Sequence, residues 1–165
     1  AGPLARFEEL AELIHATNLA RCTCDTLAGL SPQLVDLGKM LGTSDLISQM
    51  AGRYYLERCR FFLFREFVAA GVDRTISPGG ETVILYPTPE DLLRKTPGFY
   101  EHLVRPRLDD DFGKTYRYVA AHFGGDDPYA RSMQRNFDFL RSLIERNDFS
   151  RLQRKPVPLM PLPAE

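Results

Sequence analysis

The first candidates for chemistry in this chain are three polar residues that share one apolar stretch. Residues 42 to 68 are rich in aliphatic and aromatic side chains and predict a long helix, and Asp45 is a carboxylate near its start that apolar packing does not require. Gln49 and Arg53 follow at intervals of four residues, which places all three side chains on one helical face. One interpretation is that they point into a polar cavity.

A simpler interpretation uses the same spacing. Arg53 also lies four residues before Glu57, so these two side chains could form a modest salt bridge along the helix. Both interpretations fit the periodicity, and both stay open.

Other residue types that bind metals or act in catalysis are scattered. His15, His102 and His122 are far apart in the sequence, so we expect each to lie at a helix surface or to make a local hydrogen bond. The chain has neither a phosphate-binding glycine loop, nor a nucleophile elbow, nor a His-Glu-x-x-His pair.

The acidic run at residues 109 to 111 resembles a cation site in composition. Consecutive residues on a helix point in different directions, so three neighbours cannot bind one ion without an irregular loop. We therefore predict a solvated helix junction there, with Asp110 or Asp111 as a helix cap.

The cysteines favour an intracellular protein over a secreted disulfide scaffold, because there are three of them without a regular spacing. Cys22 and Cys24 are separated by one residue, which matches neither zinc-binding nor thioredoxin-like spacing, and we expect two free thiols in a loop. No apolar run is long enough to span a bilayer, and the expected compartment is the cytoplasm.

Composition predicts one ordinary globular domain. The chain has 165 residues, of which 44% are hydrophobic and 26% charged, and its net charge is −1. Such a charge gives no field that would attract nucleic acid or anionic lipid, so neither nucleic acid nor membrane is an expected partner, whereas a homo-oligomer stays open. We assign residues 1–155 to a single helical domain and residues 156–165, which include prolines 156, 158, 161 and 163, to a proline-rich tail.

The pattern of caps, prolines and apolar residues predicts an all-α fold, an irregular helical bundle around a long central apolar helix. The central helix is expected from about 44 to 70, with a cap at Thr43 or Ser44 and its end at Gly71. Tyr54, Phe61 and Phe64 are expected to lie partly or wholly inside the fold. The other helices are expected at 4 to 20, 32 to 41, from Pro89 with an interruption at 96 to 98, at 99 to 108, at 111 to 123 and from 126 onward. Residues 21 to 31 are expected to form a loop, and residues 72 to 88 an extended loop with a turn at 77 to 80.

Two segments of the chain resemble the HD superfamily, a group of helical metal-dependent phosphohydrolases. The first is Leu13-Ile14-His15-Ala16-Thr17, and the second is Gly42-Thr43-Ser44-Asp45-Leu46 with its continuation to Glu57. The family signature is a His, then a His-Asp doublet, then a later Asp that completes the metal site, and the match makes Asp45 similar to that last Asp. Asn18 is a second, weaker candidate, because some relatives place the last Asp close to an Ala-Thr segment.

The chain departs from the family in one respect, since it contains no His-Asp doublet. The resemblance therefore implies a fragment of a longer protein or a member that has lost its site. In an intact parent, a divalent metal held partly by Asp45 would activate water against a phosphate ester or nucleotide, and Arg53 would neutralise phosphate charge. This chain alone would hold no metal and show no activity.

A second hypothesis belongs to another class, a non-catalytic helical module that binds a partner or senses a small molecule. The aromatic-rich helix, the missing doublet and the proline-rich tail support it.

Overall fold

The computed structural model describes residues 10–19, 21 and 23–155, and these residues are mostly helical. The chain forms two compact units, and each is described by itself. Unit 1 comprises residues 1–51 and 98–133, and unit 2 comprises residues 52–97 and 134–165. The expectation of one domain over 1–155 stays a prediction, and the tail from residue 156 lies outside the described residues.

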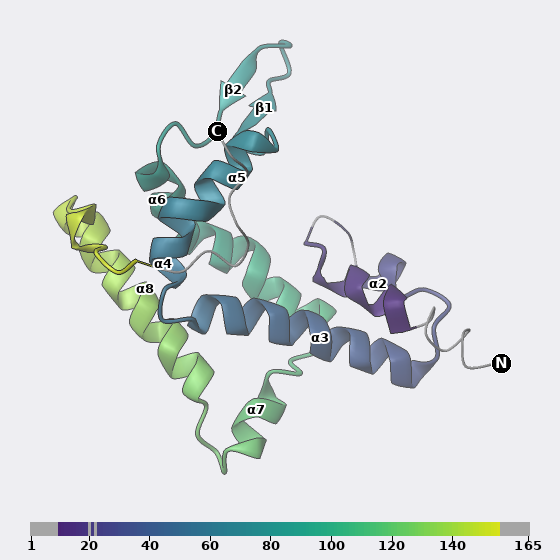
Figure 1. Cartoon of the computed structure of the whole chain (residues 1–165). Coiled ribbons are helices and arrows are strands. Elements are labelled where there is room, and N and C mark those ends of the chain that lie inside the picture. Colours follow the sequence, from purple (N-terminus) through teal and green to yellow (C-terminus); the bar gives the residue numbers. More distant parts are fainter. Residues whose placement is uncertain (1–9, 20, 22, 156–165) are drawn as a thin grey trace. The chain divides into compact units, whose positions relative to one another are not determined.

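Unit 1 is built around helix α3, Pro32–Ala51, with shorter helical segments beside it (Figure 1). The other segments that lie wholly in this unit are the 3-10 helix η1 (Leu13–Thr17), α2 (Thr23–Thr26), the π-helical segments η3 (Tyr100–Val104) and η4 (Arg107–Asp111), and α7 (Arg117–His122). The presence of α2 shows that the loop predicted at 21 to 31 is partly helical.

Helix α3 begins where the sequence predicts it, since the Ser31 side-chain oxygen accepts from the Leu34 N–H at 3.4 Å. It does not end near Gly42, because glycine there serves packing. A Cβ at Gly42 would overlap the Phe112 ring and lie 2.9 Å from the Ala16 carbonyl oxygen. Gly38, one turn earlier, likewise leaves room for Leu27. Both glycines therefore admit close neighbours without breaking the helix.

The caps predicted for the second part of this segment are consequently wrong. Thr43 is a buried residue inside α3, and its Oγ1 lies 2.6 Å from Thr115 Oγ1. Ser44 and Asp45 also lie well inside the helix, so neither occupies its first turn.

The helix predicted over 44 to 70 is wrong in its bounds, because the chain leaves α3 at Ala51 and turns at residues 52 to 54. Asn136 Nδ2 donates to the Gly52 carbonyl at 3.0 Å, and Arg154 Nη1 donates to the Arg53 carbonyl at 2.7 Å. Side chains that are distant in the sequence thus satisfy the carbonyls that the break releases.

Unit 2 continues with α4 (Tyr55–Arg58), a π-helical segment (Cys59–Leu63) and α5 (Phe64–Ala69). The predicted end at Gly71 is confirmed, since Gly71 has φ +70° and the Val72 N–H donates to the Phe67 carbonyl at 2.8 Å, as in a Schellman cap.

Two of the three aromatic residues of this segment are less buried than predicted. Tyr54 is 37% exposed and Phe61 40% exposed, whereas Phe64 is half-buried, as predicted. The core of unit 2 instead gathers residues from α4, the π-helical segment that follows it, α6, α8 and the segment after α8: Leu56, Cys59, Leu93, Leu140, Leu143, Phe149 and Leu152.

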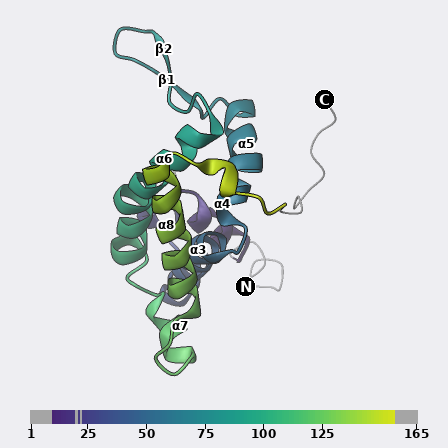
Figure 2. The same cartoon turned by 90° about the vertical axis from the view of Figure 1, so that its left-hand side faces the viewer.

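A hairpin replaces the extended loop predicted at 72 to 88 (Figure 2). Strands β1 (Arg74–Ile76) and β2 (Thr82–Ile84) pair antiparallel, with Thr75 opposite Val83. The predicted turn is confirmed, since the Gly80 N–H donates to the Ser77 carbonyl at 2.9 Å and Gly80 has φ +83°. The partner of β2 was missed because a strand of three residues carries little periodicity.

Helix α6, Pro89–Phe99, runs through the predicted interruption. Its start is the predicted one, with Thr88 Oγ1 accepting from the Asp91 N–H at 3.2 Å. Pro97 lies inside this helix and removes one N–H donor, but the Thr96 hydroxyl donates to the Leu92 carbonyl at 3.0 Å, and π-helical turns follow.

Of the last two helices, α7 begins later than predicted and α8 begins as predicted. Gly113 and Lys114 both have φ +61°, so α7 begins later than the predicted residue 111. Helix α8, Pro128–Arg146, begins as predicted, because the Asp127 carboxylate accepts from the N–H groups of Tyr129 and Ala130. Across the part of the chain that the structure describes, no helix has the length and apolarity to cross a membrane.

Candidate functional site

Asp45 is half-buried on α3, within unit 1. Its Oδ1 accepts a hydrogen bond of 2.7 Å from Gln49 Nε2, so the predicted proximity of these two side chains is correct. Gln49 is exposed, and neither residue lines the pocket described below.

Arg53 belongs to unit 2, beyond the end of α3, so the structure does not place it on one helical face with Asp45. Its guanidinium lies 5.9 Å from the centre of the Tyr54 ring. Arg53 also precedes α4, and the helical spacing that suggested a salt bridge with Glu57 does not apply.

The structure brings together no group of three or more His, Cys, Asp or Glu side chains within residues 10–19, 21 and 23–155. His15 is exposed on η1, 3.6 Å from a Glu12 carboxylate oxygen, and His122 packs edge-on against Phe123. The Asn18 backbone carbonyl accepts from the Arg107 guanidinium at 2.9 Å. The role of Asp45 as a metal ligand therefore stays a prediction.

Asp109 and Asp111 of the acidic run bind different partners, as expected for side chains that point in different directions. Asp109 accepts a 2.7 Å hydrogen bond from the Tyr116 hydroxyl, which raises the pKa of that phenol, whereas Asp111 pairs with Arg107 at 3.1 Å. The predicted cap is wrong, because all three acids lie near the end of η4 and α7 begins only at Arg117.

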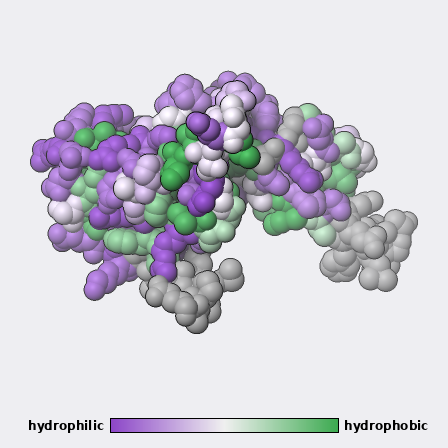
Figure 3. Space-filling model, turned by 90° about the horizontal axis from the view of Figure 1, so that it is seen from above, coloured by the Kyte–Doolittle hydropathy of each residue, from purple (hydrophilic) through white to green (hydrophobic). Residues whose placement is uncertain are grey.

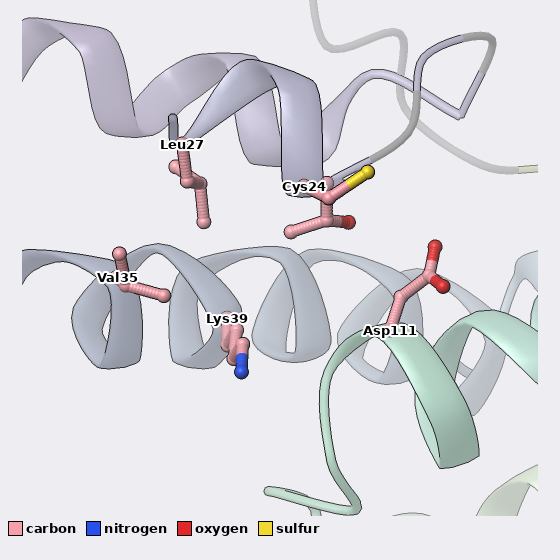
Figure 4. Close-up of a pocket in the computed structure, with 6 residues that line it drawn as sticks. Cys24, Leu27, Val35, Lys39 and Asp111 are labelled. Carbon is pink, nitrogen blue, oxygen red and sulfur yellow. The ribbon is translucent and has the colours of Figure 1, made fainter. Parts of the chain in front are cut away.

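A pocket of about 230 Å³ opens in unit 1 between α2 and α3 (Figure 4). Its lining residues come from α2, the turn that follows it, α3 and the last residue of η4: Thr23, Cys24, Leu27, Val35, Lys39 and Asp111.

The pocket has an apolar end and a polar end. Figure 4 shows Leu27, which directly follows α2, and Val35 of α3 across the gap from each other, with the Asp111 carboxylate farther along, directed toward Cys24. Lys39 contributes its stem, and its amine points to the side of α3 away from α2. Long aliphatic stems of this kind commonly cover apolar surface while the charge stays in water.

Arg107 holds the polar end in place. Its side chain is only 7% exposed, and its guanidinium bonds three partners: the carbonyls of Arg21 at 2.5 Å and Asn18 at 2.9 Å, and Asp111 Oδ2 at 3.1 Å. The planar guanidinium suits several acceptors at once. Arg107 therefore joins the segment before α2 to the segment that carries Asp111.

Two buried polar atoms in this part of unit 1 have no hydrogen-bond partner, Thr23 Oγ1 and Arg107 Nε. Thr23 is 3% exposed and lines the pocket. Buried polar groups in folded proteins are nearly always paired, so an orphan hydroxyl in a cavity marks a place for a ligand or an ordered water.

Neither of the two described cysteines, Cys24 and Cys59, provides a nucleophile, and Cys22 lies outside the described residues. Cys24 is disulfide-bonded, so the expectation of a free thiol is wrong for it. Cys59 is free, but burial raises the pKa of its thiol to about 12, which keeps it protonated at neutral pH.

Surface hydropathy does not single out another site. On the face that Figure 3 shows, hydrophobic residues lie between hydrophilic ones, and single exposed apolar residues are normal in folded proteins.

Comparisons with protein-family models, with curated proteins and with solved structures found no match to this chain. The pocket is thus characterised by its own residues. Its polar end escaped sequence analysis because Arg107 contacts Asn18 and Arg21 across 89 and 86 residues of chain.

Proposed function

We propose that this chain is a helical module that binds a small molecule in the pocket between α2 and α3. The observation that supports this proposal is the buried, unpaired Thr23 hydroxyl in a cavity that also offers an apolar wall and an Arg107–Asp111 pair. An unsatisfied buried polar group costs about 1–3 kcal/mol, and a ligand that bonds it would remove that cost.

The pocket can be tested with benzyl alcohol as a probe. We expect its addition to shift the NMR methyl signals of Leu27 and Val35 in a saturable way. Val35→Phe should weaken this binding roughly tenfold or more, because the larger ring would occupy the apolar end. The affinity is measured by NMR titration of both proteins.

Leu37→Phe is the matched control, since Leu37 belongs to the same helix, is 48% exposed and does not line the pocket. This variant should bind benzyl alcohol as the unchanged protein does. Equal binding by the Val35→Phe protein, once its fold is verified by circular dichroism, would contradict the proposal.

A second candidate function rests on the resemblance to HD phosphohydrolases. Under this proposal the chain is part of a longer enzyme that acts on a phosphate ester or nucleotide, with Asp45 as one metal ligand and Arg53 near the phosphate. The remaining ligands would come from a His-Asp doublet that this sequence does not contain.

Calorimetric titration with Mn²⁺ or Zn²⁺ tests the metal part of this candidate. We expect weak binding or none by this chain, because one carboxylate cannot hold the ion. In a parent that carries the doublet, Asp45→Ala should abolish metal-dependent hydrolysis. The fold should persist, because the exposed bond to Gln49 is worth only about 0.2–0.5 kcal/mol.

Asp36→Ala is a control, because Asp36 is an exposed carboxylate on the same helix as Asp45. Tight stoichiometric binding of Mn²⁺ or Zn²⁺ by this chain that survives Asp45→Ala would remove Asp45 from the site.

A further inference from the structure

We infer that the ligand of the α2–α3 pocket is a small neutral molecule with an apolar body and a hydroxyl- or amide-type head that both donates and accepts hydrogen bonds. This inference rests on the proposed binding function and specifies its ligand class. It follows from the size of the pocket, from the separation of its two ends and from the charge balance at the polar end.

The size of the pocket sets the scale of the ligand. A dry engineered cavity of about 150 Å³ holds one benzene molecule, whereas drug-sized ligands occupy pockets of roughly 300–1,000 Å³. At about 230 Å³, this pocket fits one ring or a short aliphatic chain with a single polar head.

The arrangement of the lining sets the orientation of the ligand. Leu27 and Val35 offer only apolar contacts, so the body of the ligand belongs between α2 and α3 at that end (Figure 4). Asp111 lies farther along the pocket, and Thr23, which also lines it, has an unpaired hydroxyl, so the head belongs with these two hydrogen-bonding side chains.

The charges at the polar end favour a neutral head. Asp111 is already balanced by the buried Arg107 guanidinium, and Lys39 directs its amine away from α2. A charged head would add an uncompensated charge beside the 3% exposed Thr23, which is costly in a partly desolvated site. A hydroxyl or primary amide can instead donate to the Asp111 carboxylate and bond the Thr23 hydroxyl in either direction.

Four probes with the same ring and different heads test the inference: benzyl alcohol, toluene, benzylammonium and benzoate. Their dissociation constants are measured on the full chain from the NMR shifts of Leu27, Val35 and Thr23. We expect benzyl alcohol to bind most tightly, with an advantage over toluene of roughly two- to tenfold, the factor that one or two net hydrogen bonds supply.

Thr23→Val tests the role of the hydroxyl, because valine keeps the shape of threonine and removes the polar atom. In this variant the dissociation constants of benzyl alcohol and toluene should become nearly equal, while toluene binds at least as tightly as before. Thr26→Val is the control, since the Thr26 hydroxyl bonds the Thr23 carbonyl and does not line the pocket.

The outcomes separate this inference from the proposed function. Tightest binding by benzylammonium would assign recognition to the Asp111 charge, and tightest binding by benzoate would assign it to Lys39. Either result, or equal binding of toluene and benzyl alcohol to the unchanged protein, overturns the inference and leaves the binding function standing. Failure of all four probes to shift the pocket signals overturns both.

Discussion

Replacing Arg107 by methionine is expected to lower the free energy of unfolding by roughly 3–5 kcal/mol, the cost of breaking a buried ion pair from one side. The guanidinium of Arg107 bonds Asp111 and the carbonyls of Asn18 and Arg21, and its side chain is only 7% exposed. Methionine keeps much of the length but supplies no donor, so all three acceptors lose their partner together. Arg107→Lys should recover only part of this loss, because an ammonium lacks the planar fork.

The measurement is chemical denaturation followed by circular dichroism, with Arg105→Met as the control. Arg105 also pairs with an acid one turn away, Glu101 at 3.2 Å, but its side chain is 60% exposed. Exposed pairs contribute about 0–1 kcal/mol, so the control should lose little stability. Similar losses for the two variants would show that Arg107 does not hold the polar end of the pocket.

Features that depend on neighbouring residues could be predicted from the sequence. Ser31 and Thr88 cap α3 and α6 as expected, Asp127 caps α8, and Gly71 ends α5. In each case the decisive hydrogen bond or backbone angle lies within a few residues of the cap, so a local pattern carries the information.

Features that depend on tertiary contacts could not be predicted. Gly42 looked like a break because glycine is a poor helix former, but the approach of Phe112 and the Ala16 carbonyl requires it inside α3. The actual break comes at Gly52, where Asn136 satisfies the released carbonyl. No periodicity between residues 42 and 68 reports these distant partners.

In the candidate site, too, local contacts could be predicted from the sequence and tertiary contacts could not. The sequence directed attention to Asp45 and Gln49, which do bond each other on α3 but line no part of the pocket. The pocket depends instead on Thr23, in a segment predicted to be a loop, and on Arg107, one of many scattered arginines. Residue type alone does not distinguish a buried guanidinium from an exposed one, because burial is fixed by the packing around it.

The two phenylalanines Phe149 and Phe61 provide the sharpest test of the core of unit 2. Phe149→Ala is expected to lower the free energy of unfolding by roughly 3–5 kcal/mol, because Phe149 is 5% exposed within the cluster that includes Leu93 and Leu140. Phe61→Ala should cost only about 1 kcal/mol, because its ring is 40% exposed.

The comparison is matched, since each ring lies under an arginine in the same unit. Arg94 lies 4.9 Å from the centre of the Phe149 ring, and Arg60 lies 5.4 Å from that of Phe61. Each substitution therefore removes one ring and one cation–π contact, and the difference isolates burial. Sequence periodicity predicts Phe61 inside the fold, on a central helix, so equal losses or a larger loss for Phe61→Ala in denaturant titrations would contradict the core described here and favour the sequence prediction.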